Sequence, residues 1–358
     1  MHIERGLLFG RPMNQDWGDR GDVGCPESWS SSLGTVTKPL DLMGALGISK
    51  EDQAVTADQS LTVAIADRPG NVATAIKETL GQLNLDDFRD KIVAIKPNDT
   101  TATAKDRSAC TQADTLQATI RFIKTLQPRR IVVTGGAGAM ETEDVFKVMG
   151  FMDILKQEDV EFFDHNKPPF KEVALTFGPQ RKIVVNPRVF EYEKLVSLAQ
   201  LKVHSTATVT LAIKNMAMSY PCADYYGHPR VKQELHPHNI LMDKQAFLVG
   251  MLMRFPIDLS IVAGHPAMIG KGPTGGKAVE TGIVIAGRDA VAVDSVGAHL
   301  LGFETLAVQH IRQAAEYGLG VPYTPIGGES GKGRLKVVGV SVEAATRSFR
   351  TLAYGEAF

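Results

Sequence analysis

The stretch LVSL at residues 195–198, followed by LKVHSTATVTLAIKN at residues 201–215, is the part of the chain around which we arrange the fold. The continuous apolar run LVSL predicts a buried strand. The second segment places Lys202, His204, Lys214 and Asn215 in an otherwise apolar and small-residue run. Because lysine and histidine are costly to bury without a partner, this pattern predicts a strand end and turn that open onto an anionic ligand. In the alternative interpretation, the lysines extend to the surface and His204 is a hydrogen-bonded core residue.

The overall composition is that of an ordinary globular protein. The 358 residues are 44% hydrophobic and 22% charged, and 39 basic against 40 acidic side chains leave a formal net charge of -1. This balance does not predict a nucleic-acid or anionic-membrane partner, so an anion site must come from local placement of charge. We find neither a leader pattern near Met1 nor an apolar run of the roughly 18 residues that a membrane crossing needs. We therefore expect a soluble, cytoplasmic protein.

The chain contains three cysteines, Cys25, Cys110 and Cys222, which are widely spaced and form no CxxC pair. Ligands of an iron–sulfur cluster usually include a closely spaced pair, so this spacing makes such a cluster an unlikely cofactor. An odd number of separate cysteines also argues against a disulfide scaffold and fits a reducing compartment.

Short apolar strands alternate with amphipathic helices from residue 61 onward. Strands are expected at 61–66, 92–95, 130–134, 160–164, 182–185, 195–198, 258–263, 281–287 and 334–340. Helices are expected at 72–83, 111–126, 141–149, 239–252, 289–301 and 306–317, with Asn71 and Thr111 capping the first two. This alternation predicts an α/β fold, a doubly wound and mostly parallel sheet with helices on both faces.

We divide the chain into three parts on the basis of composition. Residues 1–58 are rich in Gly, Asp and Ser and predict an irregular N-terminal arm. Trp17 and Trp29 lie in it and favour packing against a partner subunit, hence a homo-oligomer. Residues 59–330 form the α/β domain, with two lobes split near residue 190 as an option, and residues 331–358 form a C-terminal strand and tail.

Several polar residues follow directly after predicted strands, where ligands bind in open α/β sheets. Lys96, Asn98, Lys202 and His204 occupy such positions, as does the glycine-rich turn at residues 135–139. We predict that they face one crevice, in which His204, Lys202 and Lys214 are catalytic. The predicted ligand-binding residues are Lys96, Asn98, Thr111, Asn215, Gly270, Gly272, Gly275 and Gly276.

Several motifs, in the same order along the chain, resemble the domain of unknown function 362 family over roughly residues 61–330. They are VAIKPN at 93–98, LKVH at 201–204, VTLAIKN at 209–215, DLSIV at 258–262, GKGP at 270–273 and AGRDAVAVD at 286–294. Ala263 and Ile269 stand where family members usually carry acids. Some members also have a ferredoxin-like cluster segment, which this sequence lacks.

These residues support three functional hypotheses. The first is an enzyme that acts on a small phosphate- or carboxylate-bearing substrate or cofactor, with proton transfer by His204 or a lysine. The second is a transition-metal enzyme that uses His204, His236 and His238, with a looser, architectural likeness to lactate-racemase-type enzymes. The third is a non-catalytic binding or assembly protein.

Overall fold

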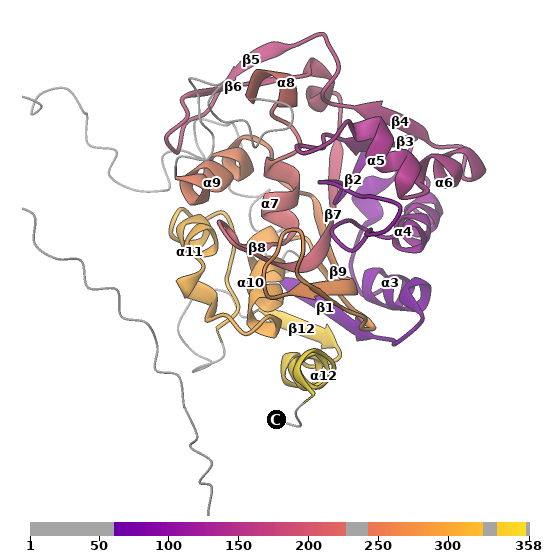
Figure 1. Cartoon of the computed structure of the whole chain (residues 1–358), viewed down its shortest axis with the longest axis vertical. Coiled ribbons are helices and arrows are strands. Elements are labelled where there is room, and N and C mark those ends of the chain that lie inside the picture. The colour runs from indigo at the N-terminus through magenta and orange to yellow at the C-terminus, as the bar shows by residue number, and fades with distance from the viewer. Residues whose placement is uncertain (1–60, 227–242, 325–334, 356–358) are drawn as a thin grey trace, which may run out of the picture.

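The computed structural model describes residues 61–226, 243–324 and 335–355. The predicted arm at residues 1–58 and the two candidate metal ligands His236 and His238 lie outside these ranges. Within them, ten strands form one mixed sheet (Figure 1). In sheet order these strands are β12 (Lys336–Gly339), β1 (Thr62–Asp67), β11 (Ile283–Gly287), β9 (Leu259–Ile269), β7 (Lys194–His204), β2 (Ile92–Pro97), β3 (Arg130–Gly135) and β4 (Glu161–Asp164), with β10 (Lys277–Val279) beside β9 and β8 (Thr208–Thr210) beside β7.

Most neighbouring strands of the main order run parallel. The exceptions are β1–β11 and β11–β9, which pair antiparallel, as do β10 with β9 and β8 with β7. A separate two-stranded sheet pairs β5 (Lys171–Ala174) with β6 (Lys182–Val185). The predicted α/β class with a mostly parallel sheet is therefore confirmed. The segments before and after residue 190 also share one sheet, because β7 pairs with β2 on one side and with β9 on the other.

Helices cover both faces of the sheet, as Figure 1 shows. One apolar core lies under α3 (Val72–Leu80), α4 (Ala113–Thr125), α5 (Thr142–Val148) and α6 (Phe151–Gln157). The other lies under α7 (Ala212–Ala217), α9 (Lys244–Arg254), α10 (Ala290–Leu300), α11 (Gln309–Glu316) and α12 (Val342–Tyr354). The remaining helical segments are α8 (Ala223–Tyr226) and the 3-10 turns η1 (Asp86–Phe88), η2 (Pro187–Phe190) and η4 (Thr305–Ala307).

The strand predicted at residues 195–198 is the centre of the sheet, but it is longer than predicted. β7 continues to His204, with a register irregularity between Gln200 and Lys202 where it pairs with β9. Lys202 and His204 therefore lie on the strand itself and not in a turn after it. The strand tolerates these polar residues because their side chains find partners, which the sequence pattern alone does not reveal.

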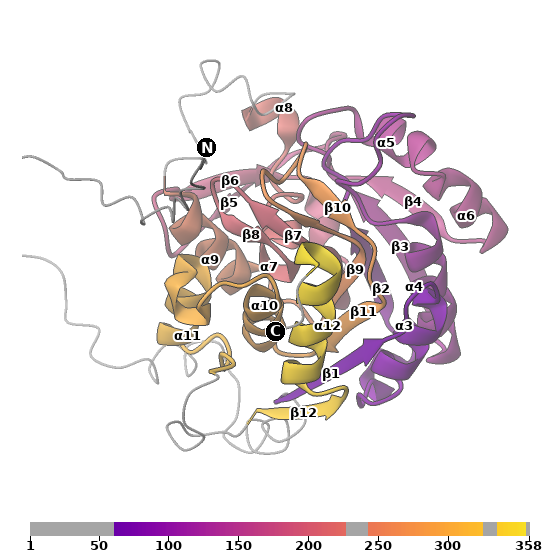
Figure 2. The ribbon, with the colours of Figure 1, turned by 60° about the horizontal axis from the view of Figure 1, so that its bottom comes forward.

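Several element boundaries also differ from the prediction. Asn71 does cap α3, since its side-chain oxygen accepts a hydrogen bond from the Thr74 N–H at 3.0 Å. Thr111 does not cap α4, which begins at Ala113, because its hydroxyl is bonded elsewhere. Residues 342–354, predicted as part of a tail, form α12, and Figure 2 shows this helix near β1 and β12. The other unpredicted elements are short: α6, α7, α8, β5, β8 and β10, whereas β6 matches the strand predicted at residues 182–185.

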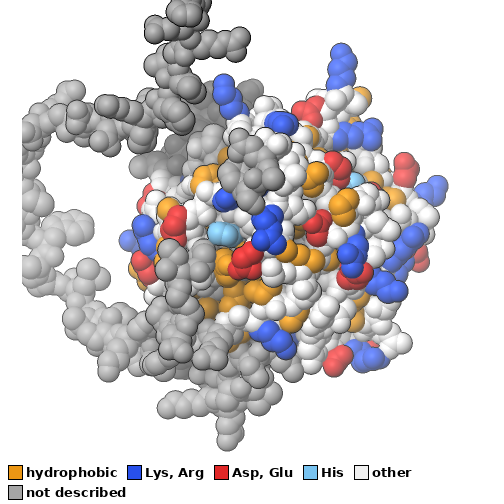
Figure 3. Space-filling model, turned by 90° about the horizontal axis from the view of Figure 1, so that it is seen from below, with side chains coloured by type: hydrophobic (Ala, Val, Ile, Leu, Met, Phe, Trp, Pro, Cys, Tyr) orange, Lys and Arg blue, Asp and Glu red, His pale blue; other side chains and the backbone are white. Residues whose placement is uncertain are grey.

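The charge on the described surface is mixed. On the face drawn in Figure 3, acidic and basic side chains are interspersed among the residues shown in colour. None of the described helices has both the length and the apolar character that crossing a membrane requires.

Candidate anion-binding site

A cavity of about 250 Å³ opens at the carboxyl ends of β2, β3 and β7. Open α/β sheets bind their ligands at this end of the strands. Its walls come from the segment after β2, the turn after β3, the end of β7 with the following turn, α7, and the start of α9. The polar and glycine residues discussed below that line it are Lys96, Asn98, Asp99, Gly136, Gly138, His204, Thr206, Thr210, Lys214, Asn215, Ser219 and Lys244.

Lys96 is 1% exposed, and its ammonium group is fully engaged by the protein. It donates hydrogen bonds to the Asp99 carboxylate at 2.8 Å, to the Asn215 side-chain oxygen at 3.1 Å and to the Pro97 carbonyl. An ammonium group has three N–H donors, so these bonds use all of them. Asn215 in turn donates to the Lys96 carbonyl and the Ser197 hydroxyl. We conclude that Asn215 holds Lys96 in place, and that Asp99 compensates its charge.

Lys202 lies behind the cavity wall and does not line it. Its ammonium group, 0% exposed, donates to the Asn98 side-chain oxygen at 3.0 Å and to the Ala109 carbonyl at 2.7 Å. Burial, opposed by the nearby Cys110 thiol and reinforced by Lys96, lowers the pKa of Lys202 to about 8. Because the Asn98 oxygen accepts from Lys202, the Asn98 amide NH₂ group is the end left to face the cavity.

Thr111 also acts on Asn98, through the backbone. Its hydroxyl accepts from the Asn98 N–H at 2.8 Å and donates to the Leu198 carbonyl at 3.0 Å. Thr111 was predicted to contact the ligand, but it does not line the cavity. Its hydroxyl instead links the end of β2 to β7. Thr111 and Lys202 together fix where Asn98 stands.

His204 lines the cavity, and its hydrogen bonds identify its tautomer. Its Nδ1 accepts from the backbone N–H groups of Thr206 at 3.1 Å and Ala207 at 3.2 Å. Since a backbone N–H only donates, Nδ1 carries no proton, and the neutral ring must carry it on Nε2. Burial, followed by the charges of Lys214, Lys244 and Lys202, lowers the pKa of His204 to about 2. This lowered pKa favours the neutral ring, so His204 can act as a hydrogen-bond donor through Nε2.

Lys214 and Lys244 bring positive charge to the cavity from two helices. Lys214 is carried by α7 and Lys244 by the first turn of α9, where its ammonium donates to the Thr206 hydroxyl at 2.7 Å. Burial lowers the pKa of Lys244. Both lysines are close enough to His204 to depress its pKa, which places the three side chains in one neighbourhood.

Two buried hydroxyl groups in the cavity lining have no hydrogen-bond partner within the described ranges. They belong to Thr210, 2% exposed, and Ser219, 1% exposed. Buried polar groups in native proteins are nearly always bonded to protein, water or ligand. Within the described ranges these hydroxyls are therefore available to a polar group in the cavity, whether water or ligand.

Of the two glycine-rich loops, the one after β3 faces the cavity. Gly136 and Gly138 line it, and the Gly136 N–H donates to the second Asp99 oxygen at 2.9 Å. The loop after β9 contributes only Pro273 to the lining. Its predicted ligand-binding glycines, Gly270, Gly272, Gly275 and Gly276, are not part of the cavity wall. A side chain at Gly272 would meet the Val203 carbonyl, so this glycine serves close packing of the loop on β7.

The metal hypothesis gains no support from the described residues. They contain no group of three or more His, Cys, Asp or Glu side chains placed to hold a metal ion. His265, another available histidine, is bonded instead to Asp114 and Glu280, which raise its pKa to about 9. Cys110 and Cys222 are buried, and no disulfide joins them within the described residues.

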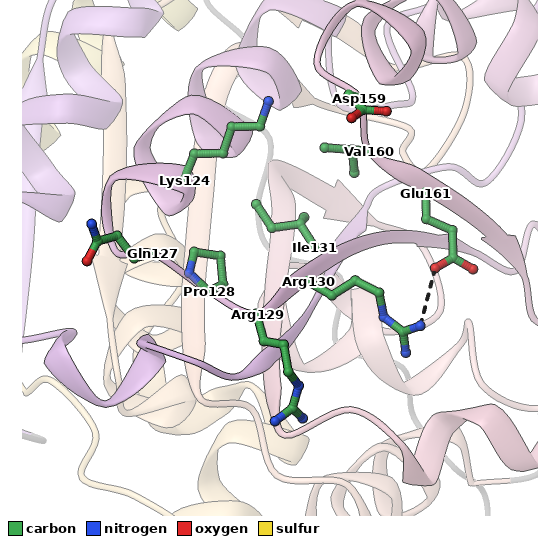
Figure 4. Close-up of a pocket in the computed structure, with 9 residues that line it drawn as sticks. All are labelled: Lys124, Gln127, Pro128, Arg129, Arg130, Ile131, Asp159, Val160 and Glu161. Atoms are coloured by element: carbon green, nitrogen blue, oxygen red, sulfur yellow. Dashed lines mark ion pairs between the residues drawn. The ribbon is translucent and has the colours of Figure 1, made fainter.

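A larger groove, of about 550 Å³, lies at the amino end of β3, the end opposite the cavity (Figure 4). It contains Lys124, Arg129 and Arg130, but their charges are paired. Lys124 contacts Glu158, Arg129 contacts Glu193, and Arg130 lies 3.9 Å from Glu161. The side chains are also substantially exposed, so solvent screens them. Size alone therefore does not make this groove the functional site.

Sequence reasoning missed Lys244, Thr210, Ser219 and the pairing role of Asp99. Lys244 had a detectable signal, because a lysine in the first turn of a helix opposes the helix dipole and needs a reason to be there. Asp99 lies three residues after Lys96 and could have been recognised as its partner. Nothing in the sequence marks the hydroxyls of Thr210 and Ser219.

The comparisons with known proteins identify a family and no activity. No curated protein matches the chain. A crystal structure of a protein from Thermotoga maritima, determined by a structural genomics consortium, is similar at 13% identity with a TM-score of 0.40; the match covers 70% of this chain and 60% of that one. Ala263 and Ile269, the two positions at which the resemblance leads us to expect acids, lie on β9 and do not line the cavity. The family model described as a domain of unknown function (DUF362) matches residues 93–299, more than half of the sequence, so the chain belongs to that family.

Proposed function

We propose that this protein is an enzyme that binds a small phosphate- or carboxylate-bearing molecule in the cavity beside His204. The observation that carries the proposal is the charge of the described lining. Lys96 and Asp99, the one carboxylate of the described lining, compensate each other, and Lys214 and Lys244 add two further basic side chains. An anion is the ligand that such an excess of positive charge favours.

The neutral donors in the lining support the same proposal. The Asn98 amide, the Nε2–H of His204 and the hydroxyls of Thr210 and Ser219 all belong to residues around the cavity. Donors fixed in advance by the protein stabilise negative charge on a ligand oxygen without reorganising during the reaction. In this role His204 donates a hydrogen bond to an oxygen that gains charge.

In this proposal a lysine, and not His204, transfers any proton that the reaction requires. Lys244 lines the cavity and has a pKa that burial lowers, which increases the fraction available as a base near neutral pH. His204 is a poor base here, because its only unprotonated nitrogen already accepts two backbone hydrogen bonds.

The cavity volume limits the ligand. Pockets for drug-sized ligands span roughly 300–1,000 Å³, and the described cavity measures about 250 Å³. We therefore propose a compact anion, or only the phosphate or carboxylate end of a larger molecule.

The experiment is a titration of the full chain with inorganic phosphate or acetate, followed by thermal unfolding at constant ionic strength. A ligand that binds only the folded state raises the unfolding temperature, and the rise grows with the logarithm of the ligand concentration once that exceeds Kd. Lys214→Ala should weaken phosphate binding by about tenfold or more, as expected for loss of one charge-assisted contact. The matched control is Lys77→Ala, which removes an exposed lysine from α3.

Two substitutions of His204 separate its two nitrogens in the same assay. Asparagine places an oxygen near the Nδ1 position, so His204→Asn should keep the turn but lose phosphate binding. Glutamine places its NH₂ near Nε2, so His204→Gln should keep binding while losing stability at the turn. Equal phosphate binding by the wild type, Lys214→Ala and His204→Asn would refute the proposal, because general salt effects act alike on all three.

A further inference from the structure

Asp294 is a fully buried carboxylate on α10 that the cavity does not contain. It is 0% exposed, and its two oxygens accept hydrogen bonds from the first two N–H groups of α7, those of Ala212 at 2.8 Å and Ile213 at 3.0 Å. The residue that precedes α7, Leu211, offers no side-chain cap. A residue more than eighty positions along the chain therefore caps this helix.

α7 has only six residues, and a helix this short is not stable on its own. Yet it carries Lys214, which lines the cavity, and Asn215, which holds Lys96. The Ser197 hydroxyl, on β7, gives further support by donating to the Ala212 carbonyl at 2.8 Å. The positions of two cavity lysines thus depend on how α7 is held.

We propose that Asp294 is a positioning residue of the anion site, which acts by fixing α7 and with it Lys214 and the Asn215–Lys96 pair. This inference rests on the proposed function. A serine or asparagine would cap a helix at lower cost, since a buried carboxylate loses its hydration. That loss, partly offset by the two backbone hydrogen bonds, raises the pKa of Asp294 to about 7. A need for stability alone does not explain a buried carboxylate at position 294. A need to hold α7 in one position does, because the two carboxylate oxygens fix two N–H groups of the helix.

The test is a double-mutant cycle read out by inorganic phosphate binding to the full chain. Asp294→Asn keeps one acceptor oxygen and replaces the other by an NH₂ group that opposes an N–H of α7. It should weaken phosphate binding about tenfold. If Asp294 acts through Lys214, the double variant Asp294→Asn/Lys214→Ala should bind only slightly more weakly than Lys214→Ala, a marked departure from additivity.

Asp289→Asn is the matched control on the same helix. Asp289 caps α10 by accepting from the Ala292 N–H and also accepts from the Val321 N–H, and none of its hydrogen bonds within the described residues reaches α7. It should lower the unfolding temperature and leave phosphate affinity unchanged. If Asp294→Asn does not fold, Ser197→Ala provides the second variant, and its phosphate affinity should fall while the protein stays folded.

The outcomes distinguish the two proposals. A wild type that binds no phosphate or acetate overturns the proposed function and this inference with it. A wild type that binds phosphate, with unchanged affinity in Asp294→Asn, overturns only the positioning role. Full additivity in the cycle overturns the part of the inference that runs through Lys214, because a general loss of structure would add to the loss of Lys214.

Discussion

Replacing Asp99 with alanine should lower the free energy of unfolding by about 3–5 kcal/mol, the cost of leaving a buried charge without its partner. Lys96 and Asp99 have side chains only 2% and 3% exposed, and their charged atoms lie 2.8 Å apart. Solvent therefore screens the pair very little. The variant also deprives the Gly136 N–H of its acceptor. Chemical denaturation of wild type and variant measures the difference.

Two further variants make this expectation specific. Glu143→Ala breaks the exposed Glu143–Lys147 pair on α5 and should have almost no effect, because both groups are in solvent. The double variant Lys96→Met/Asp99→Ala should recover much of the lost stability, since it removes both buried charges together. If Asp99→Ala costs no more than Glu143→Ala, the buried pair does not organise the site.

Lys202→Met should change how stability depends on pH. In the folded protein the pKa of Lys202 is about 8, against an ordinary value of 10.5, mainly because burial disfavours the charged form. Between these two values the unfolded chain binds a proton that the folded protein has released. The free energy of unfolding that Lys202 contributes therefore rises with pH across this window, by about 3 kcal/mol.

The measurement compares unfolding free energies of wild type and Lys202→Met at pH 7.5 and 10.5. The wild type should gain about 3 kcal/mol relative to the variant over this range. The Cys110 thiol, whose pKa burial raises to about 11 and Lys202 lowers, is replaced by alanine in both proteins, so that its titration does not enter the difference. Lys77→Met should follow the wild type at both pH values. Parallel curves for wild type and Lys202→Met would show that Lys202 is not a buried, destabilising charge.

The sequence was sufficient to predict the fold class and the edge of the sheet where the candidate site lies. Apolar runs such as residues 93–95 and 195–198 are buried on both faces in the structure, and residues that follow β2 and β3 line one cavity. These features are local or follow from the general geometry of parallel sheets, so periodicity and strand order reveal them.

The roles of individual side chains could not be predicted in the same way. Lys96 and Lys202 look alike in the sequence, but one is neutralised by a carboxylate and the other has only neutral acceptors. The proton position on His204 depends on the two backbone N–H groups of the following turn. Such assignments depend on contacts between distant segments, like that between Asp294 and α7, which no periodic pattern encodes.

The most direct test of the anion site is an anomalous difference map from a crystal of the full chain soaked in sodium selenate. Selenate is a compact dianion, and its selenium atom can be located without bias from the model. We predict a peak in the cavity, with selenate oxygens at about 3 Å from the His204 Nε2 and the Lys214 ammonium. Peaks confined to other surfaces, such as the groove at Lys124, Arg129 and Arg130, would contradict the account.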